Sequence, residues 1–560
     1  MKISKVKKLC AVALAATLGL SVLTGCGSKS ADTAKTADKQ EITYNLGADP
    51  RTLDPALCTD TTGMTVLANA FSGLAELDKN EKAIPGVAEK WDVSADGLTY
   101  TFHLKKDLKW SNGDSVKASD FEYAWKRVLN PETASEYSYQ LLYIKGAEEY
   151  NSAKGTADEL KAKQDAVGVK ATDDYTLVVN LTGPTPYFPE LTSQGYYFPV
   201  DQKVVEGNKD WATDAKTYVS NGPFKITDYK MKDQIVLEKN ENYWDKDAVK
   251  LDKLNLKLVA EETSAWASYK SGQFDVVDTV PKSDIQGALK DGSAKSFPNL
   301  ATYFLSINVS DKAKAVDPNA AKVLSDAKVR KALNLAIDRQ SIVDSVTKGG
   351  QIPADSIVAK GITDTDGKDF TEKTAYFDPK GNVEEAKKLL ADAGFPDGQG
   401  FPQLVLLYNP ESGHGDTMQA IQAMWKSNLG IDVQLQSQEW KVFLTTRVQK
   451  QYEIARDGWN ADYVDPMTFL DMFTSTSAQN NCGYNNPKFD AVIDAAKGEL
   501  DSAKRLDLLH QAEDMLMADM PIIPLYYYTR PIGIKDYVKD ARVSVMNTIY
   551  FKNAHVEGKK

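Results

Sequence analysis

The sequence predicts a mixed α/β protein with more than one domain, and three observations support this prediction. First, apolar runs that suit strands and amphipathic runs that suit helices alternate after residue 301: 404–408 predicts a strand, 417–429 a helix and 433–436 a strand. Second, short alternating strands bounded by turn signals come before residue 301. Third, 560 residues provide material for two to four domains.

The first half of the chain predicts strands and helices separated by clear turn signals. Residues 41–46 alternate as in a strand, and 61–74 carry the small and apolar residues of a helix. Ala95-Asp96-Gly97 is a hairpin signal before the alternating run 98–104. Ser119 or Asp120 is expected to cap the next helix, which ends before Pro131.

The remaining strands and helices are predicted from hydrophobic periodicity and from the turn-forming residues that bound each run. Expected strands are 176–181, 234–239, 274–277 and 522–528, and expected helices are 266–270, 329–337, 384–391 and 506–517.

Composition and charge narrow the class of protein. Hydrophobic residues make up 42% and charged residues 26% of the chain, as in ordinary globular proteins. The formal net charge of −11 argues against nucleic acid as a partner, because phosphate backbones attract clustered Lys and Arg.

The N-terminus predicts a lipoprotein signal peptide over residues 1–25. A basic start is followed by an apolar run over 9–23 and then by Cys26, which is the expected site of lipid attachment and the first mature residue. A secreted protein with an incidental cysteine is the alternative. Residues 26–40 are small and polar, so we expect a flexible tether. Cys58 and Cys482 are expected to remain unpaired thiols.

No motif in the chain indicates a cofactor, a metal or an enzyme. The four histidines are scattered without zinc-ligand spacing, and no phosphate-binding GxxxxGK[ST] is present. Ser325 and Lys328 fit S-x-x-K without the accompanying motifs of that hydrolase class.

The most informative stretch is 452–466, YEIARDGWNADYVDP. It places Arg456, Trp459, Asp462 and Tyr463 around Gly458, as a recognition site for a small zwitterion would require. A buried Asp needs a compensating cation, which an internal arginine or a ligand amine can supply. The alternative is a surface loop in which both charges are solvated.

Two segments carry a family resemblance. The order of Trp, Asp-Gly, an aromatic strand, Lys-Trp-Ser-Asn-Gly and Asp-Phe-x-Tyr-x-Trp over 86–137 closely resembles the signature of family-five solute-binding proteins, and 452–466 resembles a ligand-anchoring loop. The mature chain is similar to oligopeptide-binding receptors of ABC importers. The resemblance implies a two-lobed periplasmic-binding-protein-like fold of class II type, with an extra inserted domain and a hinge near residues 300 and 529. Lobe I would comprise 41–72, 200–300 and 529–560, the inserted domain 73–199, and lobe II 301–528.

The resemblance also implies a function and its residues. A lipid-anchored monomer outside the cell membrane would bind an oligopeptide and deliver it to permease subunits served by separate ATPase chains. Asp462 would bind the peptide amine, with Gly458, Trp459 and Asn460 along the peptide backbone. The family's basic positions correspond to Arg456, Arg447 and His414, and its aromatic cleft positions to Trp440, Tyr137 and Tyr528.

Three departures from the family pattern leave the preferred peptide length open. Asn460 and Ala301 replace a cysteine pair found in some relatives, so that disulfide is absent. A carboxylate-binding lysine is matched only loosely by Thr347 or Lys348, and Asp278 stands about where an asparagine is expected. The alternatives are a same-fold receptor for a nickel complex, haem or sugar, and, more distantly, a secreted hydrolase.

Overall fold

The computed structural model describes residues 39–410, 413–477 and 479–559. Residues 1–25, Cys26 and most of the expected tether therefore lie outside the described residues. The described helices are α1 (Thr61–Ala70), α2 (Ala118–Leu129), α3 (Ala147–Asn151), α4 (Ala157–Asp165), α5 (Phe188–Leu191), α6 (Gln202–Val205), α7 (Glu262–Lys270), α8 (Ile285–Asp291), α9 (Ala313–Val316), α10 (Pro318–Leu324), α11 (Ala327–Leu335), α12 (Arg339–Ser341), α13 (Val383–Asp392), α14 (His414–Leu429), α15 (Trp440–Val448), α16 (Met467–Leu470), α17 (Pro487–Gly498) and α18 (Ser502–Asp519).

One large mixed sheet organises the chain. Ten of its strands follow the order β15 (Val433–Ser437), β14 (Leu404–Tyr408), β16 (Ile454–Asn460), β12 (Lys295–Ile307), β17 (Ile522–Ile534), β11 (Val276–Val277), β1 (Glu41–Asn45), β10 (Lys253–Lys257), β9 (Gln234–Lys239) and β8 (Phe224–Lys230). The eleventh strand, β13 (Ile352–Pro353), pairs with β17.

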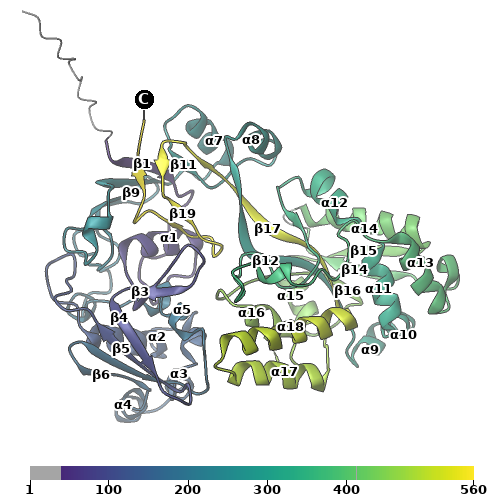
Figure 1. The fold of residues 1–560 in the computed structure, drawn as a ribbon, viewed down its shortest axis with the longest axis horizontal. Coiled ribbons are helices and arrows are strands. Elements are labelled where there is room, and N and C mark those ends of the chain that lie inside the picture. Colours follow the sequence, from purple (N-terminus) through teal and green to yellow (C-terminus); the bar gives the residue numbers. More distant parts are fainter. Residues whose placement is uncertain (1–38, 411–412, 478, 560) are drawn as a thin grey trace, which may run out of the picture. The chain divides into compact units, whose positions relative to one another are not determined.

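Two long antiparallel strands, β12 and β17, run side by side through the middle of this sheet (Figure 1). Their register is interrupted between Pro298, which pairs with Thr529, and Thr302, which pairs with Tyr527. Three residues of β12 therefore stand opposite one residue of β17, as in a bulge that bends the strand. This irregularity falls where the resemblance places the hinge; the hinge and the domain boundaries remain predictions.

Smaller sheets surround the large one. The order in the four-stranded sheet is β4 (Ala88–Val93), β5 (Thr99–Leu104), β7 (Thr176–Asn180) and β6 (Val169–Asp173). Three two-stranded pairs join β2 (Ala75–Leu77) with β3 (Ala83–Pro85), β18 (Val538–Lys539) with β21 (His555–Val556), and β19 (Arg542–Val543) with β20 (Ile549–Tyr550).

The start of α2 differs from the expected cap. The N-cap is Lys117, not Ser119 or Asp120. Asp120 instead lies in the first turn, where its carboxylate accepts hydrogen bonds from the Lys117 backbone N–H at 2.8 Å and from the Trp110 indole N–H at 3.3 Å. The carboxylate therefore reaches back to the start of the helix from the third helical position, as in one half of a capping box.

The two faces of the β12–β17 pair belong to different apolar cores. Phe304 and Tyr527 contribute to the main core, whereas Tyr303 and Tyr526 contribute to a second core. The second core also contains the buried Trp425, whose indole N–H donates a hydrogen bond to the Leu333 carbonyl at 2.8 Å. A smaller core around Trp266 and Tyr269 supports α7 and α8. The predicted strand–helix–strand alternation after residue 301 is present as β14, α14 and β15.

Two further observations bear on the expectations. Cys58 and Cys482 are buried free thiols, as predicted. Over 39–559, apart from the undescribed positions 411–412 and 478, no helix has both the length and the apolar character needed to cross a bilayer.

Candidate ligand-binding site

Strand β16 carries the predicted site and has one open edge. Along its whole length it pairs with β12, from Ile454 opposite Ile307 to Asn460 opposite Ala301. On the other side β14 pairs only with Ile454 and Ala455. Among the described residues, no strand occupies the edge over 456–460, so an extended ligand can add there as a further strand.

Asp462 follows β16 and faces a cavity of about 310 Å³, called here the Asp462 cavity. Burial raises the pKa of this carboxyl to about 6. Its backbone N–H donates to Thr468 Oγ1 at 3.1 Å, and no ion pair of Asp462 occurs among the described residues. The site therefore holds a carboxylate that lacks a protein cation and gains from binding an external one.

Aromatic side chains form part of the same cavity. Tyr137 and Tyr196 both line it, with ring centroids 5.1 Å apart in a stacked arrangement. Burial raises the pKa of Tyr196, and the Asp462 charge acts in the same direction. The structure thus brings Tyr137 and Asn460 together with Asp462 at one end of β16.

A second group of predicted residues lines another cavity of about 400 Å³, called here the Arg456 cavity. Arg456, His414 and Tyr528 all face it. The Arg456 guanidinium lies 5.1 Å from the centroid of Tyr303, and its Nε is buried without a hydrogen-bond partner. The Tyr303 hydroxyl also forms a hydrogen bond with His414 Nδ1 at 3.0 Å. Tyr303 therefore contacts both basic side chains, Arg456 through its ring and His414 through its hydroxyl.

Gly458 lies between the two cavities along β16. A Cβ at this position would stand 3.5 Å from the Tyr528 hydroxyl and 3.9 Å from Arg456 Nη2. Its backbone N–H donates to Asp457 Oδ1 at 2.8 Å. These distances are ordinary van der Waals contacts, and they place Gly458 beside both Arg456 and Tyr528.

Arg447 occupies a different place from Arg456. It pairs with Asp457, and the two side chains are only 12% and 3% exposed. Asp457 also accepts hydrogen bonds from Ser306 Oγ at 3.1 Å and Asn481 Nδ2 at 3.3 Å. Arg447 lines neither cavity. Its guanidinium is neutralised by the buried Asp457 carboxylate. Its role towards a ligand remains a prediction.

The other expected positions are distributed as follows. Trp459 is half-buried against the main core, and its indole nitrogen is buried without a partner. Trp440 begins α15, but its side chain lies outside the described part of the chain. Thr347 lines the Arg456 cavity. Asp278 accepts a hydrogen bond from Tyr44 at 2.7 Å and pairs with Arg530 at 2.9 Å, so it serves internal contacts.

Sequence reasoning missed Tyr303, Tyr196 and Lys282, which contribute to these two cavities or to their walls. Tyr303 lies within a predominantly apolar strand, where a tyrosine indicates core packing rather than a site. Lys282 lies in an exposed turn before α8, far from the motif in sequence.

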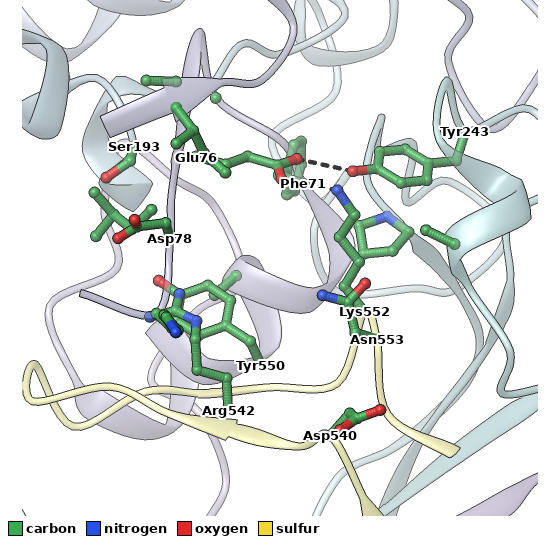
Figure 2. Close-up of a pocket in the computed structure, with 18 of the residues that line it drawn as sticks. Phe71, Glu76, Asp78, Ser193, Tyr243, Asp540, Arg542, Tyr550, Lys552 and Asn553 are labelled. Atoms are coloured by element: carbon green, nitrogen blue, oxygen red, sulfur yellow. Dashed lines mark hydrogen bonds and ion pairs between the residues drawn. The ribbon is translucent and has the colours of Figure 1, made fainter. Parts of the chain in front are cut away.

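A further cavity, of about 750 Å³, lies beside β2, β3 and the C-terminal segment (Figure 2). Glu76 accepts a hydrogen bond from Tyr243 at 2.8 Å and an ion pair from Lys552 at 2.8 Å, while Arg542 pairs with Glu81 at 2.9 Å. The cavity shares walls with the Asp462 cavity, but none of the predicted site residues line it. The charges of Glu76, Lys552 and Arg542 are already neutralised by protein groups, so they do not require a charged ligand.

The fold and the paired cavities define a binding protein, and comparison assigns its family. Residues 82–481 match the model of bacterial extracellular solute-binding proteins, family 5 Middle. The chain belongs to this family, and its fold is the two-lobed α/β fold predicted from the sequence.

Individual relatives agree over nearly the whole length. The oligopeptide-binding protein OppA of Bacillus subtilis is 38% identical over 543 residues, covering 95% of each chain. The unliganded open form of the periplasmic murein tripeptide-binding protein MppA has a TM-score of 0.80 at 31% identity, covering 93% of this chain and 98% of that chain. Haemophilus influenzae OppA in complex with the peptide RPPGFSPFR has a TM-score of 0.65, again at 31% identity, covering 93% and 99%.

Proposed function

We propose that this protein is an extracytoplasmic receptor that captures oligopeptides between its lobes and delivers them to an ABC permease. The observation that carries the proposal is the half-buried carboxylate of Asp462, which has no ion pair among the described residues and lies beside the open edge of β16. The relatives' descriptions as oligopeptide- and tripeptide-binding proteins support it.

The amine is the group that every unblocked peptide shares. A receptor that fixes this ammonium against Asp462 acquires a reference point that does not depend on sequence. The peptide main chain then runs along the edge over 456–460, where backbone hydrogen bonds also ignore side-chain identity. Such contacts suit a receptor with broad specificity.

The Arg456 cavity suits the opposite end of the ligand. Arg456 lies six positions before Asp462, and an extended chain rises about 3.3–3.6 Å per residue. A peptide that runs from one cavity to the other therefore contains about six residues. Shorter peptides would place their carboxylate nearer to Gly458, between the two cavities.

Binding rather than catalysis is supported by the relatives, which are described as peptide-binding proteins. Anchoring both ends of a ligand requires lobe closure but no reacting group. We propose that the hinge uses the register break near Pro298 and Thr302, since a few residues suffice to absorb the rotation.

A change in pH tests the proposed function. The Asp462 carboxyl, with its pKa raised to about 6, must release a proton before it can bind an ammonium group, so affinity falls as pH decreases through 6. Calorimetry with a free-amine pentapeptide is expected to give about tenfold weaker binding at pH 5 than at pH 7.

The Asp462→Asn variant is the control for this experiment, because it keeps Asp471, whose pKa burial also raises to about 6. Its affinity, though lower, is expected to be flatter between pH 5 and 7. An identical pH profile in both proteins would contradict the assignment, as would a ligand whose binding ignores the amine, such as a nickel complex, haem or sugar.

We further propose that Cys26 carries a lipid that holds the receptor at the outer face of the cell membrane. A single acyl chain anchors weakly, whereas two or more chains anchor stably. Cys26→Ala is expected to release the protein into the medium or to leave an unprocessed precursor, as fractionation and mass spectrometry of the N-terminus would show. Normal processing with membrane retention would contradict the anchor.

A further inference from the structure

The Arg456 cavity is formed by two parts of the protein that have separate cores. His414, Thr417 and Tyr526 line it from the side of the core that contains Tyr303. Lys282 and Ile285 line it from the side of the smaller core beneath α8. A ligand group in this cavity therefore touches both parts at once.

Lys282 supplies a cation from the second side. Its side chain lines the cavity, and its Nζ lies 3.6 Å from the point where a Cβ on Gly413 would stand. An Asp416 carboxylate oxygen lies 4.0 Å from the same point. Among the described residues, which do not include positions 411–412, no ion pair involves Lys282 and no acidic residue lines the cavity.

We propose that Lys282 is a specificity-determining residue that binds the terminal carboxylate of longer peptides together with Arg456 and His414. This inference rests on the proposed function, and it assigns to Lys282 the task for which the sequence offered only Thr347 or Lys348. Arg456 is positioned by Tyr303, whereas a lysine ammonium on its flexible stem can follow a carboxylate over several ångströms.

The position of Lys282 also allows one ligand group to bridge the two parts. A carboxylate held by Arg456 and His414 on one side attracts Lys282 on the other, so a bound carboxylate adds an ion pair between them. Existing contacts keep them near each other: Gln286 Nε2 donates to the Asp344 carbonyl at 3.2 Å, and Leu289 Cδ1 lies 3.1 Å from the Cβ position of Gly350. A peptide that is too short to reach the cavity lacks this contribution.

The test is calorimetry on a series of peptides of three to seven residues, each with a free and an amidated C-terminus. Lys282→Gln is expected to weaken free-acid peptides that reach the cavity by about three- to thirtyfold and to leave the shortest peptides unchanged. Amidated peptides should bind the native and variant proteins equally well. Lys282→Arg should retain most of the affinity because it keeps the charge.

Lys290→Gln is the matched control, since Lys290 is an exposed lysine on α8 that does not line the cavity. It is expected to bind every peptide as the native protein does. An equal effect of Lys282→Gln on free-acid and amidated peptides, or no effect at any length, would overturn the inference. If N-acetylation still weakens binding in that case, the proposed function stands and only the role of Lys282 fails; if no peptide binds the native protein, both fail.

Discussion

Replacing Asp462 by asparagine is expected to weaken every peptide with a free amine by roughly thirty- to several-thousand-fold, whatever its sequence. In the closed protein the ammonium has lost its water and depends on this carboxylate. Removing one partner of a buried charge pair costs about 2–5 kcal/mol, which corresponds to this range. Calorimetry on several unrelated peptides measures whether the loss is uniform.

The same substitution should not harm the fold. Asp462 has no protein cation among the described residues, and burial disfavours its charged form, so asparagine removes an unfavourable charge rather than a favourable pair. Thermal unfolding is therefore expected to be unchanged or slightly improved. Asn460→Ala, at an exposed residue that lines the same cavity, is the matched control and should affect affinity far less. Comparable losses in both variants would indicate general damage to the cavity.

Arg447→Met is expected to lower the free energy of unfolding by about 3–5 kcal/mol, the usual cost of leaving one member of a buried ion pair alone. The pair with Asp457 is almost fully buried, and Asp457 connects β16 to Ser306 and Asn481. Methionine has a similar length, so most of the loss should come from the uncompensated carboxylate. Chemical denaturation followed by circular dichroism measures it.

The double variant Arg447→Met, Asp457→Asn separates the two roles of Arg447. Because it removes both charges, it should recover a substantial part of the lost stability. If Arg447→Met instead left stability unchanged and weakened only peptides of particular lengths, Arg447 would bind the carboxylate as the family pattern implies, and its ion pair with Asp457 would contribute little.

The motif pointed to residues that the structure places at cavities, but it did not indicate their internal contacts. Asp462, Arg456 and His414 line two cavities along β16, and their role in binding a peptide stays a prediction. The pairing of Arg447 with Asp457 was not predictable, because both arginines fit the same pattern and only the folded strand decides which one meets an internal carboxylate. Lys282 was missed because its turn reaches the cavity from a distant part of the chain.

In the fold as well, elements set by local sequence were predicted, whereas pairings between distant segments were not. The alternation of β14, α14 and β15 follows from local periodicity and was predicted. The pairing of β12 with β17 joins segments more than two hundred residues apart, and its register break depends on both strands together. The cap of α2 was misplaced because the hydrogen bond that the Lys117 backbone N–H donates to the Asp120 carboxylate gives no separate signal in the sequence.

The most direct test of the central claim combines one peptide, its N-acetylated form, the native protein and Asp462→Asn in a double cycle measured by calorimetry. The account predicts that acetylation and the substitution each cause a large loss of affinity and that acetylation costs the variant little more, because both changes break the same ammonium–carboxylate pair. Equal binding of the free and acetylated peptides by the native protein, or full additivity of the two losses, would show that Asp462 does not bind the peptide amine.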